Sequence, residues 1–255
     1  MIDTGTGSPI VVVPGIEGRW EWMHPAIVTL SRRHRVLTYS LSRTKLDGNG
    51  NGFDHFIEQL NQILDTAELE QATICGVSYG GLIALRYAAR HTNRVSSLIL
   101  VSTPGPSWKP NYQVERSLRL PHLQFLAFVA RGPSRLWHEI ARAHDTLPAC
   151  IAFSLKHTFR VVTAPCSPTQ MAKRIRLLKG INFETDCIKV TAPTLVITGE
   201  SRLDRVVPVN STKEFLRLIP HAVSATLGRT GHIGLISRPE DFAEIVEPFV
   251  ATHDL

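Results

Sequence analysis

Short apolar runs alternate with amphipathic runs over both ends of the chain. Six nearly continuous apolar runs predict buried strands: Pro9–Val13, Arg35–Tyr39, Ala72–Val77, Val95–Val101, Thr194–Thr198 and Ala222–Leu227. Apolar residues at helical spacing predict helices between them: Glu21–Arg32, Asp54–Ala67 with Asp54 as its cap, Ser78–Arg90, Ser211–Leu218 and Pro239–Val250. Continuous apolar strands that alternate with helices indicate an α/β fold, with a mostly parallel central sheet and helices on both faces.

The pattern changes between Thr103 and about Asp186. This stretch has no clear strand, and prolines divide it into segments that look like short helices. We therefore expect a sheet core built from residues 1–103 and 187–255, with a helical insertion at 104–186. With 255 residues, of which 43% are hydrophobic, the chain is long and apolar enough to bury a core of that size.

Charge is concentrated in the same insertion. The whole chain has a net charge of +6, whereas residues 105–185 hold 12 Lys and Arg against 4 Asp and Glu, a net charge of +8. The basic residues are scattered at helical spacing and no nucleic-acid motif accompanies them, so no nucleic-acid partner is expected. Four of them are expected to face outward from the insertion: Arg116, Arg119, Arg131 and Arg135.

Other features of the sequence restrict the class of protein to which it can belong. No apolar run reaches the roughly 18 residues that a membrane span needs, and the first ten residues lack the features of a signal peptide. The four cysteines show no CxxC spacing, which disfavours both a disulfide framework and a zinc site. A cytoplasmic protein with reduced thiols, no metal and no cofactor is the expectation.

The segment Gly76-Val77-Ser78-Tyr79-Gly80 lies where a predicted strand ends and a predicted helix begins. A nucleophile on so sharp a turn needs small neighbours two residues to either side, and Gly76 and Gly80 meet that need. Ser78 would then project from the carboxyl edge of the sheet, where open α/β folds bind ligands. We predict that Ser78 is a nucleophile.

A serine hydroxyl needs a base, and the base needs an orienting carboxylate. His232 follows the last predicted strand and can reach the same edge. Two acids follow the Thr194–Thr198 strand, and we favour Asp204 over Glu200 because Asp204 lies within the loop. The order of Ser78, Asp204 and His232 in the chain differs from the orders of the two best-known serine protease folds.

A tetrahedral intermediate needs two N–H donors. Tyr79, directly after the nucleophile, is one candidate. Ile16, in the glycine-rich turn that follows the first strand, is the other.

With these segments in this order, the chain resembles the α/β-hydrolase fold superfamily, in its serine branch. The resemblance rests on Pro9–Gly18, Gly76–Gly81, Ala192–Gly199 and Gly231-His232. It implies Ser78, Asp204 and His232 as a catalytic triad and Ile16 and Tyr79 as oxyanion donors. It also implies that the insertion is a cap that shapes the acyl pocket.

Three departures from the family pattern stand out. Pro14-Gly15 replaces the usual His-Gly, so the support of the oxyanion turn differs. The hairpin strands that usually come first are missing or very short. The acid lies five residues after Gly199, further than usual, which keeps Glu200 open as an alternative.

The nucleophile narrows the function. A serine at this position argues against the dehalogenases and epoxide hydrolases of the fold, which use a carboxylate. The turn at 14–18 is unlike the Ser-Gly-Pro-rich loop of carbon–carbon bond hydrolases. The leading prediction is hydrolysis of a small to medium carboxylic ester or thioester through an acyl-enzyme. Acyl transfer, carbon–carbon bond hydrolysis and ligand sensing with the same residues stay as alternatives.

Substrate contacts are predicted from position alone. Arg19, Trp20 and Trp22 follow the oxyanion turn and are candidates for the pocket mouth, although Trp22 would equally pack the first helix onto the sheet and Arg19 would equally be solvated. Apolar residues of the insertion are candidates for the pocket wall: Leu123, Phe125, Leu126 and Phe128.

Overall fold

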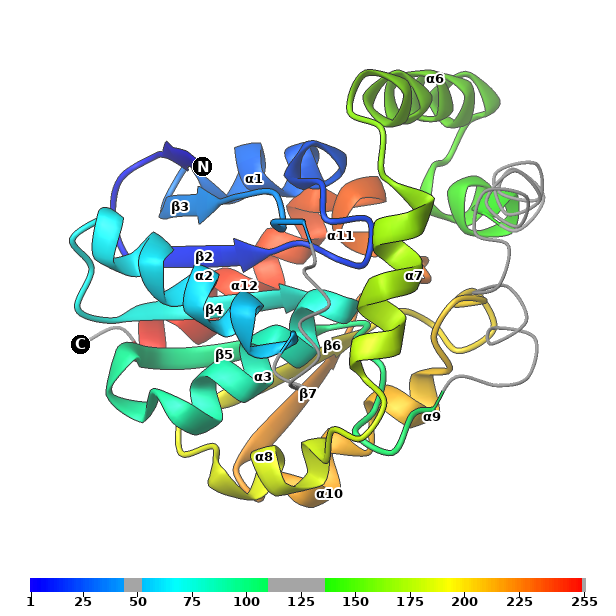
Figure 1. Ribbon diagram of the computed structural model, residues 1–255. Helices are drawn as coiled ribbons and strands as arrows, with labels where there is room; N and C mark the ends of the chain where they lie inside the picture. The colour runs from blue at the N-terminus through cyan, green and yellow to red at the C-terminus, as the bar shows by residue number, and fades with distance from the viewer. Residues whose placement is uncertain (44–51, 110–135, 254–255) are drawn as a thin grey trace.

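The computed structural model describes residues 1–43, 52–109 and 136–253. Its centre is a seven-stranded sheet in the order β1-β3-β2-β4-β5-β6-β7 (Figure 1). The strands are β1 (Ile2–Thr4), β2 (Pro9–Val13), β3 (Arg35–Thr38), β4 (Ala72–Val77), β5 (Val95–Val101), β6 (Thr194–Thr198) and β7 (Ala222–Thr226). Strand β1 pairs antiparallel with β3, and every other pairing is parallel. The mostly parallel sheet predicted from the apolar runs is thus confirmed.

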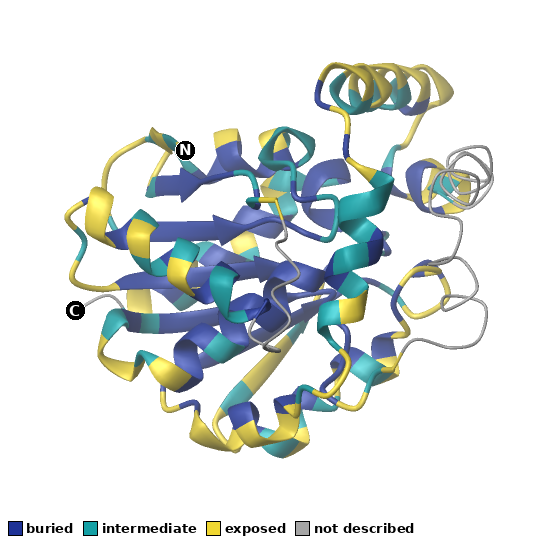
Figure 2. Ribbon diagram, viewed as in Figure 1, coloured by how far each residue is buried: buried dark blue, intermediate teal, exposed yellow. Residues whose placement is uncertain are grey.

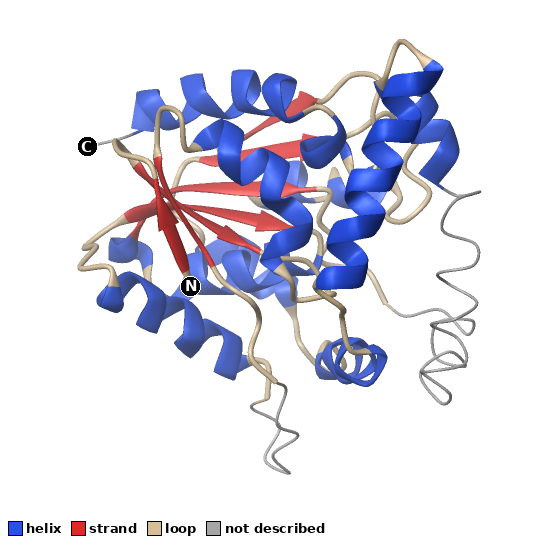
Figure 3. Cartoon of the chain, turned by 90° about the horizontal axis from the view of Figure 1, so that it is seen from above, coloured by secondary structure: helices blue, strands red, loops and turns tan. Residues whose placement is uncertain are grey.

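Helices cover both faces of this sheet (Figure 3). They are η1 (Trp20–Met23), α1 (His24–Leu30), α2 (Asp54–Thr66), α3 (Tyr79–Arg90), η2 (Thr92–Arg94), α6 (Leu147–Thr163), α7 (Pro168–Leu177), α8 (Phe183–Lys189), α9 (Val209–Thr212), α10 (Phe215–Leu218), α11 (Gly234–Ser237) and α12 (Pro239–His253). One core cluster joins α2, α3 and α8 to one face, and a second joins α1, α11 and α12 to the other. Strand residues alternate between the two: Val11 belongs to the first cluster and Val12 to the second. Burial on both faces explains the continuous apolar runs.

Several predicted elements have different bounds. The first predicted helix is divided, with 3₁₀ geometry over Trp20–Met23 before α1, because Pro25 is accommodated only in the first turn of an α-helix. The helix predicted at Ser211–Leu218 is two short helices, α9 and α10. The hydroxyl of Thr212 donates to the carbonyl of Thr103 at 2.7 Å, which ties α9 to the end of β5. Strand β1 was not predicted, since three residues are too few to show a period.

The predicted cap of α2 was also wrong. Asp54 is the first residue of the helix, and the residue before it, Phe53, makes no side-chain capping bond. The Asp54 carboxylate instead pairs with Arg90 at 3.0 Å and Arg86 at 3.5 Å on α3. These ion pairs hold α2 against its neighbour, an arrangement that the local pattern around Asp54 does not reveal.

The described part of the expected insertion is helical. It comprises a helix at 136–143, then α6 and α7, and α8 continues across position 186 and packs against α3. Helix α6 lies at the outside of the molecule, and Figure 2 shows much of its surface exposed. Its exposed apolar residues recur at helical spacing: Leu147, Ile151, Leu155, Phe159 and Val162. Helix α7 lies closer in, beside the carboxyl ends of the strands (Figure 1).

Candidate active site

Ser78 occupies a strained turn between β4 and α3. Its φ of 52° lies in the left-handed region, which non-glycine residues seldom adopt without a structural reason. The Ser78 N–H donates to the carbonyl of Val101 at 2.8 Å, which anchors the turn to β5. A Cβ atom added to Gly80 would lie 2.4 Å from the carbonyl oxygen of Val13, so only glycine lets α3 start this close to the end of β2.

Three of the predicted residues form a hydrogen-bonded chain. His232 Nε2 lies 3.2 Å from Ser78 Oγ, and His232 Nδ1 lies 3.3 Å from Asp204 Oδ2. The other oxygen of Asp204 accepts the N–H groups of Val206 and Val207, each at 2.9 Å. Asp204 is therefore fixed by its own loop and directed at the imidazole.

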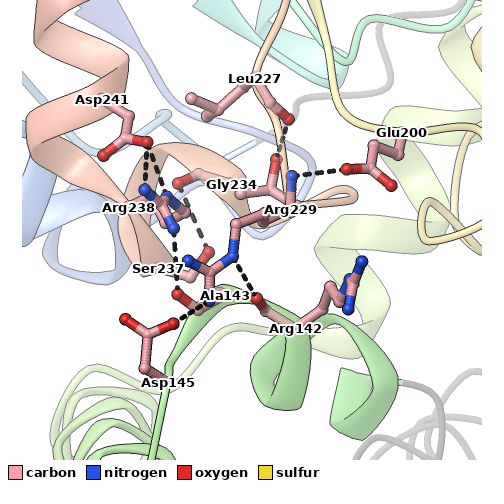
Figure 4. A network of polar contacts seen from close by, with 11 residues as sticks. Arg142, Ala143, Asp145, Glu200, Leu227, Arg229, Gly234, Ser237, Arg238 and Asp241 are labelled. Atoms are coloured by element: carbon pink, nitrogen blue, oxygen red, sulfur yellow. Dashed lines mark hydrogen bonds and ion pairs between the residues drawn. The ribbon is translucent and has the colours of Figure 1, made fainter.

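Glu200 has a different environment (Figure 4). Its carboxylate accepts the Arg229 N–H at 2.7 Å and pairs with Arg202 at 2.8 Å, and these two donors lower the pKa of Glu200. Arg229 in turn donates to the carbonyl of Arg142 and pairs with Asp145, beyond the end of the 136–143 helix. Glu200 thus belongs to a network that joins the loops after β6 and β7 to the insertion.

Two further carboxyl groups influence His232. Glu139, only 1% exposed, accepts the N–H of Ile233 at 2.9 Å, and burial raises the pKa of Glu139 to about 7. Burial also raises the pKa of Glu17. Hydrogen bonds from the backbone N–H groups of Glu17 and Gly15 offset part of this rise. Burial lowers the pKa of His232, but Asp204, Glu139 and Glu17 outweigh it, and the net shift is upward from the usual 6.5. A protonated imidazole is thus favoured by its surroundings.

The two predicted oxyanion donors belong to adjoining elements. Tyr79 is the first residue of α3, so its N–H lies at the positive end of the helix. Ile16 lies in a turn closed by a 2.9 Å bond from the Gly18 N–H to the Gly15 carbonyl. The close approach of Gly80 to Val13 and Pro14 brings this turn beside the start of α3.

The predicted substrate residues have separate partners. Arg19 pairs with Glu21 at 2.6 Å. The Trp22 indole donates to the carbonyl of Ala164 at 3.0 Å and therefore fastens η1 to the segment between α6 and α7. Trp20 lines a surface groove with Leu155 and Phe159 of α6. The remaining predicted residues, Leu123, Phe125, Leu126 and Phe128 and the arginines 116, 119, 131 and 135, lie outside the described residues.

Sequence reasoning missed Glu17 and Glu139, which influence His232, and Arg174, a buried arginine of α7 that donates to the carbonyl of Ile16 at 2.7 Å. Glu17 lies within the predicted oxyanion turn, and its position was the one available signal. Glu139 and Arg174 are single charged residues among many in the insertion, and no local pattern distinguishes them.

Over the described ranges, no group of three or more His, Cys, Asp or Glu side chains is arranged to hold a metal ion. The four cysteines are free thiols. None of the helices in the described part of the chain is both long and apolar enough to cross a membrane.

The site has a serine with a strained backbone directly after a parallel strand, and this serine is hydrogen-bonded through a histidine to a carboxylate, both from later loops. This arrangement is typical of α/β enzymes that carry a nucleophile at the edge of the sheet. Comparison with known proteins also places the chain among α/β enzymes of this kind. Residues 8–134 match the family model for the alpha/beta hydrolase fold. A 2-hydroxymuconate semialdehyde hydrolase of Pseudomonas putida is 30% identical over 220 residues, which cover 86% of this chain and 76% of that protein.

Two further matches extend over nearly the whole chain. A pimeloyl-[acyl-carrier protein] methyl ester esterase of Aliivibrio salmonicida is 25% identical, covering 98% of this chain and 95% of that protein. The crystal structure of the enol-lactonase from Burkholderia xenovorans LB400 superposes with a TM-score of 0.78 at 21% identity, covering 98% and 95% of the two chains. The chain belongs to the α/β-hydrolase fold family, and its expected class, a hydrolase, is confirmed by these relatives.

Proposed function

We propose that the protein is a serine hydrolase that cleaves small to medium carboxylic esters or thioesters through an acyl-enzyme on Ser78. The observation that carries this proposal is the hydrogen-bonded chain from Ser78 through His232 to Asp204, at 3.2 and 3.3 Å. A relative that is a methyl ester esterase supports the choice of bond.

The arrangement of Ser78, His232 and Asp204 suits both the formation and the hydrolysis of an acyl-enzyme. His232 Nε2 accepts the proton of Ser78 Oγ as that oxygen attacks the acyl carbon, and Asp204 holds Nδ1–H and stabilises the imidazolium. The N–H groups of Ile16 and Tyr79 receive the negative oxygen of the tetrahedral intermediate. Its collapse expels the alcohol or thiol, which takes the proton from His232. Water then attacks the acyl-enzyme by the same route and releases the acid.

In this proposal residues 104–186 act as a cap over the sheet edge, and residues 1–103 and 187–255 form the core. Supporting contacts reach from the insertion to the site: Trp22 to Ala164, and Glu139 to the backbone beside His232. Trp20, which follows the oxyanion turn, stays a candidate for contact with the acyl or alcohol group.

The test is labelling with a fluorophosphonate, followed by kinetics with p-nitrophenyl esters of increasing chain length. The wild-type protein should label at Ser78 and hydrolyse the esters. Ser78→Ala should abolish labelling and reduce kcat by roughly 10³-fold or more, and adding His232→Ala should cost little more, because the residues act as a unit. Full labelling of Ser78→Ala would refute the proposal.

Carbon–carbon bond hydrolysis is a second candidate, favoured by the 30% identical relative, a 2-hydroxymuconate semialdehyde hydrolase. The same nucleophile and base would serve it. Turnover of that semialdehyde, with esters hydrolysed far more slowly, would select this candidate.

A further inference from the structure

Arg174 is a buried cation in the last turn of α7. Its side chain is only 3% exposed although the residue belongs to the basic insertion. Nη1 donates to the carbonyl of Ile16 at 2.7 Å, and Nη2 donates to the carbonyls of Leu41 and Ser42 at 3.3 and 3.4 Å. One guanidinium therefore joins the turn after β2 to the loop after β3.

The same residue also contacts the start of α3. The hydroxyl of Tyr79 donates to the main-chain carbonyl of Arg174 at 3.2 Å, and Tyr79 is itself 3% exposed. Arg174 thus contacts both residues whose N–H groups are proposed to hold the oxyanion, Ile16 through its side chain and Tyr79 through its backbone.

The turn is shaped to accept this arginine. Gly18 has a φ of +68°, and a Cβ atom added there would lie 2.5 Å from Nη1 of Arg174. The Gly18 carbonyl accepts the N–H of Leu41 at 3.0 Å. The turn after β2 and the loop after β3 are therefore joined by a backbone hydrogen bond as well as by the guanidinium of Arg174. A glycine at position 18 leaves the guanidinium room to reach the Ile16 carbonyl.

We propose that Arg174 is a positioning residue that holds the oxyanion turn in register with Tyr79. The usual His-Gly before the oxyanion residue is Pro14-Gly15 in this chain, and proline has neither a backbone N–H nor a polar side chain with which to brace the turn. Arg174 supplies the brace from the insertion, and a planar guanidinium suits the task because its several N–H groups point in fixed directions. The proposal rests on the proposed function and adds to it that the catalytic geometry depends on α7.

The test compares Arg174→Met and Arg174→Lys with Lys179→Met, an exposed lysine just beyond α7. Misplacing the turn weakens transition-state binding more than substrate binding. Arg174→Met should therefore lower kcat by about 10- to 100-fold and weaken inhibition by phenylboronic acid, which forms a tetrahedral adduct with serine, by a similar factor. KM should change by about 3-fold or less. Arg174→Lys should recover part of the loss, and Lys179→Met should behave as the wild type.

A purely structural role predicts another result. If Arg174→Met lowers the melting temperature and raises KM while kcat and boronate affinity stay unchanged, Arg174 only docks the insertion and the proposal is overturned. Should Arg174→Met fail to fold, Tyr79→Phe removes the second contact alone, and a fall in boronate affinity larger than the change in KM supports the brace, whereas equal changes oppose it.

Hydrogen exchange separates this proposal from the proposed function. In Arg174→Met the amide of Gly18, which bonds to Gly15, should exchange faster than in the wild type and in Lys179→Met. This readout applies even if the wild type hydrolyses no ester, an outcome that would refute the proposed function alone. Unchanged exchange together with unchanged kcat would overturn the brace.

Discussion

At the scale of single residues, the site combines one histidine with three carboxyl groups. Of these carboxyl groups, only Asp204 is hydrogen-bonded to the imidazole ring, whereas Glu139 binds the backbone next to it and Glu17 acts through its charge. The pattern of the sequence was sufficient to propose Ser78, Asp204 and His232, because each follows a predicted strand. It favoured Asp204 over Glu200 from position in the loop but left Glu200 as an alternative, since both follow β6 and side-chain direction is not encoded locally.

Substitution of the two acids tests their roles. Asp204→Asn should lower kcat by roughly 10²- to 10⁴-fold with the fold intact, because an amide favours the wrong histidine tautomer. Glu200→Gln should lower kcat little and act mainly on stability, since Glu200 binds Arg229 and Arg202. Ester kinetics and thermal melting of both variants measure this. A larger kcat loss in Glu200→Gln would assign the orienting role to Glu200.

The pH profile follows from the surroundings of His232. In the proposed mechanism His232 acts as the base in its neutral form, and Asp204 is the main group that raises the pKa of His232 above 6.5, so kcat/KM should rise with pH through a midpoint above 6.5. Asp204→Asn removes that cause, and the midpoint should move to lower pH while the rate falls. Glu139→Gln is the comparison, because burial raises the pKa of Glu139 to about 7 and its charge also raises the pKa of His232; the midpoint should move less in Glu139→Gln than in Asp204→Asn, since Asp204 contributes more. A midpoint that stays in place in Asp204→Asn would contradict this account.

At the scale of elements, the strands buried on both faces were predicted from the sequence, whereas the short strand β1 and the 3₁₀ geometry of η1 were not. Strands β2, β4, β5 and β6 are buried on both faces and gave continuous apolar runs. Strand β1 has three residues, and η1 has a 3₁₀ geometry that the apolar period does not encode. The sequence predicted that the sharp turn at Ser78 requires Gly80, but it did not predict that Gly80 would lie against the end of β2.

The start of α3 allows a matched glycine comparison. Gly80→Ala forces a methyl group against the Val13 and Pro14 carbonyls at 2.4 and 2.5 Å, so the backbone has to shift. We expect a loss of about 1–3 kcal/mol in the free energy of unfolding and a fall in kcat, because the shift displaces the oxyanion turn. Gly228→Ala is the control, as a Cβ atom there meets no atom within 4 Å. Equal melting temperatures for the two variants would disprove the packing argument.

At the scale of the whole molecule, the charge distribution bears on substrate capture. Residues 105–185 of the insertion carry a net charge of +8, and the insertion contributes residues that reach the sheet edge, so anionic esters would be attracted towards the site. The alternative is that these charges are simply the solvated faces of helices. Exposed charge is screened over about 10 Å at 0.1 M salt.

Salt dependence distinguishes the two accounts. We would measure kcat/KM for a neutral and an anionic ester of equal chain length from low to high salt. If the insertion steers substrates, kcat/KM should fall with salt for the anionic ester alone. Parallel curves would leave the charge without a role in capture.

The contacts that complete the site join residues far apart in the chain. Ser78 and His232 are 154 positions apart, Arg174 and Ile16 are 158 apart, and Trp22 and Ala164 are 142 apart. Because of such separations, local patterns revealed neither the role of Arg174 nor the contact between Trp22 and Ala164. They also delay folding, because loop closure has to precede each contact. During refolding from denaturant, the helical circular dichroism signal should therefore recover before fluorophosphonate reactivity does. In a growing polypeptide, reactive Ser78 should appear only after the loop that carries His232 has left the ribosome.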